Sequence, residues 1–324
     1  MILRGINYFK YFYKKKKNIK NILSKYKNYL KSGVYIITPN KIYLKNSKWE
    51  KFLNYKHSFL IDLFFTEEIN IKNYDEKDMG ECLILSSNNL PKIFSSTHVL
   101  TFLSYSHIQK LKRVNEYVKN YFNTTYIEFK RDMVIEKFIM DEKTINLDEL
   151  NTVYTLCFKF YQSQQYEIKK IDIKVLENNY NKLTQENKDF IEKLIQFANQ
   201  KIPFIYTHND IHFENILKSN NRFFFIDWEY FDKNLFFYDY LNILFVSALK
   251  GKKEFLDMYL RGGLDCYFDK LFDIFNIKYC KKKRNEYLYM YLLQKIVLRD
   301  CEEEAYHFNK VINKYKKVLK DFNC

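Results

Sequence analysis

One stretch of the chain, from Phe204 to Tyr240, constrains the architecture more than any other. It begins with an apolar run, Phe204 to Tyr206, which is typical of a buried strand. This strand stops at a polar loop that holds three side chains able to bind a ligand or to exchange a proton. They are His208, Asp210 and Asn215.

The residues after this loop predict a β-hairpin. Two apolar runs, Ile216-Leu217 and Phe223 to Ile226, flank a polar connection that is rich in Asn. Asn and Ser favour tight turns, so the two runs are expected to pair as antiparallel strands. Asn215 precedes the first strand and Asp227 follows the second, and the hairpin therefore brings them to the same end.

Oxygen-bearing side chains gathered in this way suit phosphoryl transfer from a nucleotide. A carboxamide and a carboxylate can hold a hard cation, so Asn215 and Asp227 are the candidate magnesium ligands. Asp210 and His208 are the candidate catalytic residues: Asp210 would orient the acceptor hydroxyl or take its proton, and His208 would brace the loop by hydrogen bonding. In the alternative interpretation, these residues only shape turns and cap a strand.

The same stretch resembles the aminoglycoside phosphotransferase and choline kinase family, which has a protein-kinase-like fold. The resemblance implies ATP as the donor substrate, Mg2+ as the cofactor, a catalytic base at Asp210, magnesium ligands at Asn215 and Asp227, and a structural anchor at Asp239. It also implies an α+β bilobal fold, with a small antiparallel β-sheet N-lobe carrying one helix and a larger, mainly helical C-lobe. The residues that carry it are His208-Asn209-Asp210-Ile211-His212-Phe213-Glu214-Asn215, Ile226-Asp227-Trp228-Glu229-Tyr230 and Asp239.

The chain before the loop has the element order of such an N-lobe. The pattern predicts strand, strand, strand, helix, strand and strand. We therefore expect a basic N-terminal segment at 1–49, a nucleotide-binding N-lobe at 50–140, and a helical C-lobe at 141–324 with the catalytic loop and the acceptor site. The predicted N-lobe elements are Cys82–Leu85, Lys92–Phe94, Val99–Leu103, a helix from about His107 to Phe122, Tyr126–Phe129 and Val134–Phe138.

The N-lobe departs from the family pattern where the nucleotide phosphates would lie. The turn Ser86 to Asn89 has no glycine, and the third strand has no lysine. Lys92 on the preceding strand and Glu116 on the helix are the candidate substitutes for the phosphate-binding lysine and its partner, and a surface role is the alternative for both. The segment Glu136 to Ile139 corresponds to the hinge, whose backbone would hold adenine.

After the hinge the pattern is mainly helical. A long apolar-periodic helix is expected over Leu147–Gln164, and a more polar helical region follows to Ala198. Further helices are expected after Asp239, the last of them from Glu302 to Phe322.

Two explanations remain open for Trp228, Glu229 and Tyr230, which follow the candidate magnesium ligand. They could edge an acceptor pocket, where an aromatic ring and a carboxylate suit a cationic alcohol such as choline, or a sugar. Alternatively, Trp228 belongs to the core and Glu229 is a structural hydrogen-bond partner.

The net charge of +15 raises the question of an anionic partner. No nucleic-acid-binding motif accompanies the charge, so we expect no nucleic-acid partner. Met1 to Leu30 predicts a basic amphipathic helix, which would contact a membrane surface peripherally, pack on the N-lobe or form a basic tail. Six cysteines without metal-site spacing, no secretory signal and no membrane-spanning run predict a cytoplasmic protein.

These features predict an ATP- and magnesium-dependent phosphotransferase that moves the γ-phosphoryl group to a hydroxyl of a small molecule, such as a sugar, a cell-envelope precursor or a choline-like amino alcohol. Two other functions stay open. A pseudokinase or nucleotide-binding module without turnover would explain the missing strand lysine and glycine loop. A membrane-peripheral kinase of a lipid-linked acceptor would explain the basic, aromatic start of the chain.

Overall fold

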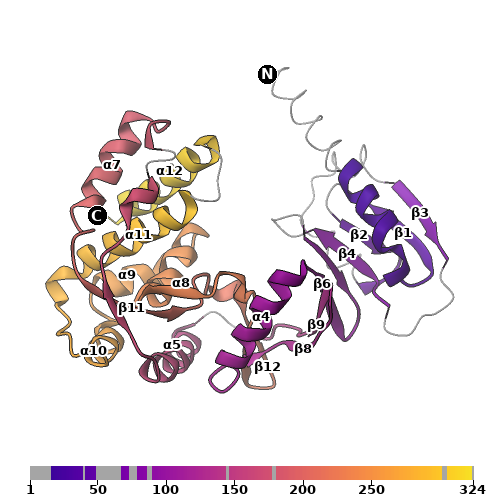
Figure 1. Cartoon of the computed structure of the whole chain (residues 1–324), viewed down its shortest axis with the longest axis horizontal. Helices are drawn as coiled ribbons and strands as arrows, with labels where there is room; N and C mark the ends of the chain where they lie inside the picture. The colour runs from indigo at the N-terminus through magenta and orange to yellow at the C-terminus, as the bar shows by residue number, and fades with distance from the viewer. Residues whose placement is uncertain are drawn as a thin grey trace. The chain divides into compact units, whose positions relative to one another are not determined.

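The protein divides into two compact units in a computed structural model (Figure 1). Unit 1 comprises Met1–Tyr117 and Thr124–Met140, and unit 2 comprises Val118–Asn123 and Asp141–Cys324. The structure describes residues 16–38, 41–48, 67–72, 79–85, 90–143, 146–176, 180–300 and 305–322. The turn from Ser86 to Asn89, where we expected a phosphate-covering loop, lies outside these residues.

Unit 1 is built on an eight-stranded antiparallel sheet with the order β3-β1-β2-β4-β5-β6-β9-β8. Two of its strands, β1 and β2, belong to the basic N-terminal segment at 1–49. They join the sheet of the predicted N-lobe because β2 pairs directly with β4. The strands are β1 (Gly33–Ile37), β2 (Lys41–Leu44), β3 (Glu67–Ile71), β4 (Cys82–Leu85), β5 (Pro91–Phe94), β6 (His98–Phe102), β8 (Tyr126–Phe129) and β9 (Met133–Lys137).

A helical segment, residues 16–26, covers one face of this sheet. Ile19 and Leu23 lie four residues apart, hence on one side of the helix, and both are buried against Leu83 and Ile93 of the sheet. The structure thus shows packing on the sheet for this part of the N-terminal helix, and these two apolar side chains are not available to a membrane surface. Residues 1–15 lie outside the described part of the chain.

The single long helix of the predicted N-lobe is α4 (Tyr105–Val118), which buries Ile108, Leu111 and Val114 at helical spacing. It ends four residues earlier than we predicted. The N–H groups of Tyr121 and Phe122 bond to the Val118 carbonyl in a turn, and the Phe122 ring then packs on aromatic rings of unit 2. The apolar spacing therefore continues past the end of the helix, because Phe122 packs in the core of unit 2. The two-residue strand β7 (Asn123–Thr124) follows.

Unit 2 is mainly helical, and the α+β class with a sheet lobe and a helical lobe is confirmed. None of the helices within the described ranges is both long and apolar enough to cross a membrane. The regular elements are α5 (Leu147–Gln162), β10 (Glu167–Lys169), η2 (Ile173–Leu176), α7 (Gln185–Ile195), β11 (Ile202–Thr207), η3 (Phe213–Asn215), β12 (Ile216–Ser219), β13 (Arg222–Phe225), η4 (Trp228–Tyr230), β14 (Asp232–Leu235), α8 (Tyr238–Leu249), α9 (Glu254–Leu260), α10 (Asp265–Asp273), η5 (Lys281–Lys283), α11 (Arg284–Asp300) and α12 (Ala305–Asp321).

The expectation of a continuous helical region up to Ala198 is wrong. β10 and η2 precede α7, and β10 and β14 flank the buried strand β11 on its two sides. Both flanking strands are short and polar, so their sequences show no apolar alternation. Their hydrogen-bond partners on β11 make them strands, and those partners are distant in sequence.

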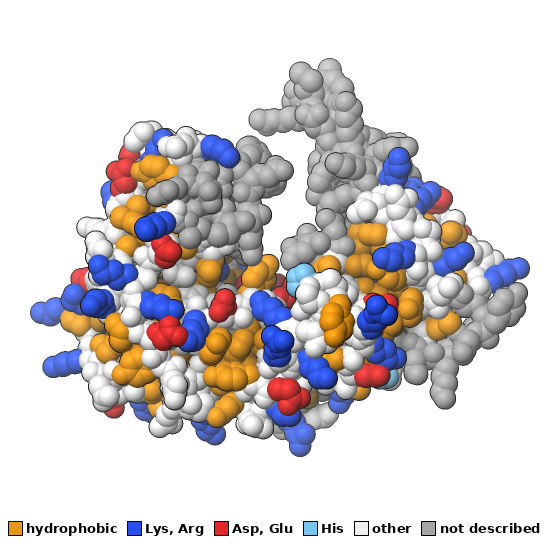
Figure 2. Space-filling model, in the orientation of Figure 1, with side chains coloured by type: hydrophobic (Ala, Val, Ile, Leu, Met, Phe, Trp, Pro, Cys, Tyr) orange, Lys and Arg blue, Asp and Glu red, His pale blue; other side chains and the backbone are white. Residues whose placement is uncertain are grey.

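The helices α5 and α8 form the centre of unit 2. Tyr154 and Tyr240 stack with ring centroids 4.0 Å apart, and each hydroxyl donates a hydrogen bond to the other residue's carbonyl (2.9 and 2.8 Å). α8 is buried over almost its whole circumference, as expected of a helix enclosed by others. Most charged side chains lie on the surface, and Figure 2 shows Lys and Arg spread among acidic and uncharged residues on the visible face.

The packing of the N-terminal helix is testable. Ile19→Ala removes a fully buried side chain, so we expect the free energy of unfolding to fall by about 2–5 kcal/mol, because a cavity remains in the sheet core. Urea unfolding of the full chain measures this change. Lys17→Ala, on the exposed side of the same helix, is the matched control. Equal stability of the two variants would show that the helix does not pack on the sheet.

Candidate active site

The predicted loop follows the buried strand β11 and is held by one carboxylate. Asp239, in the first turn of α8, is buried and accepts hydrogen bonds from the backbone N–H groups of His208 (2.8 Å) and Asn209 (3.0 Å). It also accepts one from the hydroxyl of Tyr161 on α5 (2.7 Å). These contacts correspond to the structural anchor that the resemblance implied for Asp239.

A second set of bonds holds Asn209, which has a positive φ of 67°. Its side-chain oxygen accepts hydrogen bonds from Thr207 and Asn234, and its amide nitrogen donates to the carbonyl groups of Tyr230 (2.8 Å) and Asp232 (3.1 Å). The left-handed backbone conformation is costly for most residues but is tolerated by Asn. The loop is therefore fixed on both sides of its sharp turn before Asp210 is reached.

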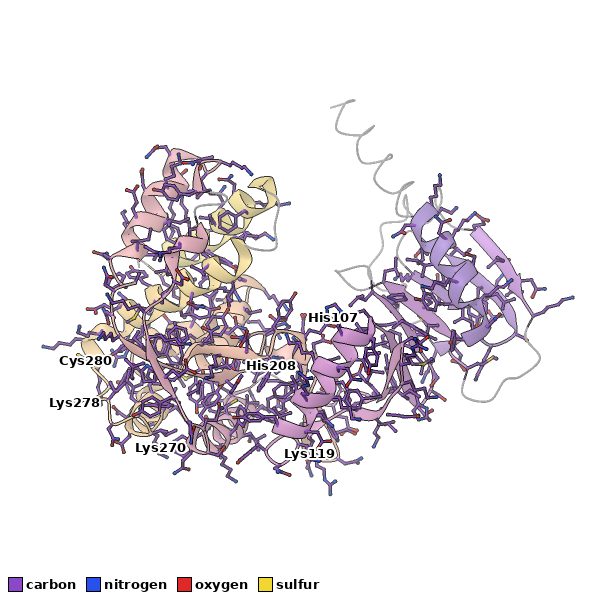
Figure 3. All side chains as sticks on the ribbon, viewed as in Figure 1. His107, Lys119, His208, Lys270, Lys278 and Cys280 are labelled. Carbon is purple, nitrogen blue, oxygen red and sulfur yellow. The ribbon has the colours of Figure 1, made fainter. Side chains whose placement is uncertain are left out.

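His208 connects the loop to the end of the predicted hairpin. Its Nε2–H donates a hydrogen bond to the carbonyl of Ile226 (2.8 Å), and its ring packs on Trp228 with centroids 4.4 Å apart. His208, which is labelled in Figure 3, is buried. His208 thus braces the loop, and it does so at the residue that precedes Asp227.

Asp210 and Asn215 lie in direct contact. The Asn215 amide nitrogen donates to the Asp210 carbonyl (2.9 Å) and to its carboxylate Oδ2 (3.1 Å). Because the nitrogen is used in this way, the amide oxygen of Asn215 is left as the group that could bind a cation. The Asp210 carboxylate is half-buried, and one of its two oxygens accepts this hydrogen bond from Asn215.

The hairpin brings Asp227 to the same end, as the sequence pattern predicts. β12 and β13 pair from Ile216 opposite Phe225, and the N–H of Ile226 donates to the Asn215 carbonyl (3.0 Å). Asp227 itself has φ 58° and ψ 52°, a left-handed conformation that recurs at functional sites because the surrounding structure must enforce it. A carboxylate and an amide oxygen are a donor set that suits Mg2+.

His212 lies beside Asp210 and is neutral at pH 7. Burial lowers the pKa of His212 to about 4, although the Asp210 carboxylate opposes this effect. Its Nδ1 accepts a hydrogen bond from the Glu214 N–H (3.2 Å), which places the ring proton on Nε2, 3.8 Å from Asp210 Oδ2. The side chain therefore presents an N–H toward the carboxylate.

The structure decides between the two explanations for Trp228. Its side chain is 1% exposed, packs against Phe122 and Phe225, and donates its indole N–H to the Phe225 carbonyl (2.9 Å). Trp228 is a core residue and does not form the wall of an acceptor pocket. Tyr230, at 36% exposed, is the more accessible of the aromatic pair.

Lys92 lies half-buried on β5, directly opposite Thr101 of β6. The Thr101 hydroxyl donates to the carboxylate of Glu136 (3.0 Å), and so does the hydroxyl of Thr125 (2.8 Å). Lys92 therefore shares its sheet face with a carboxylate, because directly opposed side chains lie on one face. Its role at the nucleotide stays a prediction.

Two backbone donors of the expected hinge are used within unit 1. The N–H of Lys137 bonds to the Thr125 carbonyl (2.7 Å), and the N–H of Phe138 bonds to the Thr97 carbonyl (2.8 Å). An adenine base at this segment would have to use other groups. That the backbone from Glu136 to Ile139 holds adenine stays a prediction.

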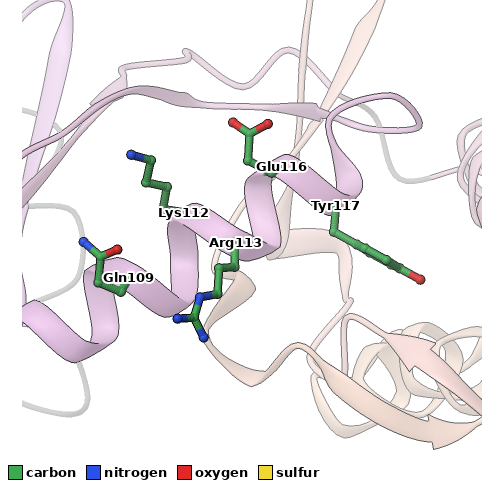
Figure 4. A pocket seen from close by; sticks show the side chains of 5 residues that line it. All are labelled: Gln109, Lys112, Arg113, Glu116 and Tyr117. Atoms are coloured by element: carbon green, nitrogen blue, oxygen red, sulfur yellow. The ribbon is translucent and has the colours of Figure 1, made fainter.

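Glu116 lies on the exposed side of α4 and lines a cavity of about 490 Å³ (Figure 4). Its role as partner of Lys92 stays a prediction. The residues that line the cavity all belong to this helix: Gln109, Lys112, Arg113, Glu116 and Tyr117.

Sequence reasoning missed several residues that hold the loop. Tyr161 lies within the helix predicted over Leu147–Gln164, but nothing in the apolar pattern of that helix indicates a hydrogen bond to Asp239. Asn209 stands beside Asp210 in the motif, and Asn favours tight turns and tolerates the left-handed conformation. That signal could have found it.

The buried carboxylate of Asp239 makes stability depend on pH. Burial raises the pKa of Asp239 above its usual 3.8, while His208, Tyr161 and two N–H groups partly offset the shift. A raised pKa means that the folded state keeps the proton to higher pH than the unfolded chain does. The stabilising contribution is therefore complete below pH 3.8 and is lost as pH rises through the folded-state pKa.

We expect the difference in unfolding free energy between the wild type and Asp239→Asn to shrink as pH rises above 3.8 and through the raised pKa of Asp239. Asp239→Asn also changes the hydrogen bonds to the loop, but this change adds an offset that is independent of pH. Urea unfolding at a series of pH values measures the difference. A difference that grows with pH would contradict the raised pKa.

The sequence model of the phosphotransferase enzyme family matches residues 161–271, about a third of the chain, including the whole of the loop and hairpin. No curated protein sequence matches the chain. Similar solved structures include a glucosamine kinase in complex with glucosamine, ADP and inorganic phosphate, with 10% identity over 74% of this chain and 79% of that chain, and a TM-score of 0.49.

A choline/ethanolamine kinase family protein from Mesorhizobium loti has 14% identity over 73% of this chain and 87% of that chain, with a TM-score of 0.47. The gentamicin-APH(2″)-IIa complex has 16% identity over 74% and 89%, with a TM-score of 0.44. Because these TM-scores lie below 0.5, the assignment rests on the family match and on the elements of the chain itself. The family match confirms the predicted resemblance for residues 161–271, which include the loop and the hairpin.

Proposed function

We propose that the protein transfers the γ-phosphoryl group of ATP to a hydroxyl of a small molecule, with Mg2+ as the cofactor. One observation carries this proposal. Asp210 and Asn215 contact each other in a loop whose two ends are both bonded to Ile226, the residue before Asp227. Three oxygen donors are thereby tied to one end of a β-hairpin.

In the proposed mechanism, Asp210 accepts a hydrogen bond from the acceptor hydroxyl and takes its proton as the oxygen attacks the γ-phosphorus of ATP. The bond between this phosphorus and the β,γ-bridging oxygen breaks, and ADP leaves. Phosphoryl transfer depends mainly on positioning and on charge stabilisation, so a carboxylate held by Asn215 is well suited to this role. His212 presents its Nε2–H on the same side and helps to aim the carboxylate.

The side-chain oxygens of Asn215 and Asp227 would hold Mg2+, which when bound neutralises the charge of the nucleotide phosphates. The amide orientation of Asn215 supports this role, because its nitrogen already bonds to Asp210 and its oxygen is left for a cation. The strained backbone of Asp227 fits a carboxylate that must point in one direction.

We assign nucleotide binding to the N-lobe at 50–140 and the acceptor site to the C-lobe at 141–324. Lys92 is the proposed phosphate contact, supported by its half-buried position on a central strand of the sheet, and Glu116 is its proposed partner on α4. The acceptor would be a sugar, a cell-envelope precursor or a choline-like amino alcohol. Burial of Trp228 removes one cation–π wall, so a cationic acceptor would need Tyr230 or another ring.

A nucleotide-binding protein without turnover is the second candidate function. The absence of a lysine on β6, where Thr101 bonds to Glu136, favours it. Nucleotide binding with no transfer to a broad panel of alcohols and sugars would support this alternative. Residues 16–26 give no support to a lipid-linked acceptor, because the apolar side of this helix packs on the sheet. The cytoplasmic location stays a prediction.

Asp210→Ala tests the catalytic assignment. We expect kcat to fall roughly 10²–10⁴-fold, because the acceptor hydroxyl loses its proton acceptor, while nucleotide affinity is retained. Coupled-enzyme detection of ADP with a library of alcohols measures turnover, and thermal shift with ATP measures binding. Asp269→Ala, an exposed aspartate on α10, is the control. An unchanged rate in Asp210→Ala would refute the assignment.

Removal of Mg2+ tests the metal ligands. Chelation by EDTA should abolish transfer, and added Mg2+ should restore it. In Asp227→Ala the Mg2+ concentration for half-maximal rate should rise at least about tenfold, since one ligand is lost. Asp269→Ala again serves as the control and should titrate like the wild type. A wild-type Mg2+ dependence in Asp227→Ala would remove this residue from the site.

A further inference from the structure

A second buried contact holds the loop from the side of α8 and α11. The carbonyl of Ile211, which directly follows Asp210, accepts a hydrogen bond from the side-chain nitrogen of Asn242 (2.8 Å). Asn242 is fully buried on α8 and lies almost one helical turn after Asp239. The helix that anchors the start of the loop therefore also bonds to the residue after the proposed base.

The side-chain oxygen of Asn242 is held by two donors from α11. The hydroxyl of Tyr291 donates at 2.8 Å and the ammonium group of Lys295 at 2.6 Å. Tyr291 and Lys295 are four residues apart and so project from one side of the helix. The chain of contacts runs from Lys295 through Asn242 to the backbone of the loop.

Lys295 is an unusual residue for this position, because its side chain is only 5% exposed. A buried ammonium group loses its hydration, and replacing a buried charge by an apolar residue of similar size is often neutral or stabilising. The Asn242 oxygen and the rings of Tyr238 and Tyr291, 5.9 and 5.8 Å away, compensate part of this cost. A reason for the place of this ammonium group beside Asn242 lies in the hydrogen bonds that it can make.

The orientation of the Asn242 amide supplies that reason. An asparagine amide can occupy one site in two orientations related by a half turn, and only one of them presents N–H to the Ile211 carbonyl. A tyrosine hydroxyl can donate or accept, so Tyr291 is compatible with both orientations. An ammonium group only donates, so Lys295 is compatible only with the orientation that directs the nitrogen toward the loop.

We propose that Lys295 and Asn242 are positioning residues, and that Lys295 selects the amide orientation that holds the Ile211 backbone and thereby the direction of the Asp210 carboxylate. Neither residue is assigned a contact with substrate. The catalytic consequence rests on the proposed function, whereas the effect on the loop backbone does not depend on it.

Lys295→Met keeps the length of the side chain and removes the donor. We expect faster amide hydrogen exchange in peptides that cover the loop after β11, with unchanged exchange in α5 and α7. We also expect kcat to fall about 10- to 100-fold with an unchanged KM for ATP, because a misplaced base affects the chemical step. Lys317→Met, an exposed lysine on α12, is the matched control.

Asn242→Asp provides a second test if Lys295→Met lowers the stability of the whole protein. The carboxylate can pair with Lys295, but when ionised it cannot donate to the Ile211 carbonyl. It should therefore reproduce the loss in kcat and the faster exchange of the loop while the protein stays folded.

The outcomes are separable. Wild-type exchange and kcat in a folded Asn242→Asp or Lys295→Met protein would overturn the positioning role. If the wild type transfers no phosphoryl group to any acceptor, the proposed function fails, and the exchange measurement alone decides the role of Lys295. A rise in KM with unchanged kcat would instead place these residues in substrate binding and overturn the inference.

Discussion

The buried carboxylate of Asp239 is the interaction on which the rest of the site depends. It accepts hydrogen bonds from two consecutive N–H groups of the loop and from Tyr161, and so joins β11, α5 and α8 at one point. Burial of a carboxylate is costly unless its oxygens are satisfied, and these three donors satisfy them. The stacked pair of Tyr154 and Tyr240 keeps the two helices at the spacing that this arrangement needs.

From this anchor the loop is built outward by short polar contacts. His208 and the Asn215 carbonyl both bond to Ile226, so the hairpin and the loop cannot move independently without breaking hydrogen bonds. Asn209 in the loop and Asp227 after the hairpin both have left-handed backbones. Strain at such positions is retained only where neighbouring contacts enforce it, and here these contacts are visible.

Unit 1 differs more from the family pattern than unit 2 does. On the sheet face of Lys92, Glu136 accepts hydrogen bonds from Thr101 and Thr125, and two N–H groups of the expected hinge are used inside the sheet. A nucleotide bound here would meet polar groups that already make hydrogen bonds to one another within unit 1. The proposed phosphate contact at Lys92 would then be made on the sheet face that carries the Glu136 carboxylate.

The sequence by itself determined the order of strands and helix from Cys82 to Lys137, the loop after β11, and the hairpin that has Asn215 and Asp227 at the same end, because apolar periodicity and turn chemistry act between residues close in the chain. Only the tertiary structure decided that Trp228 is core, that β14 is a strand, and that Lys295 supports the loop through Asn242. Each of these depends on partners far away in sequence, and no local pattern records which distant groups will satisfy a buried side chain or a strand edge.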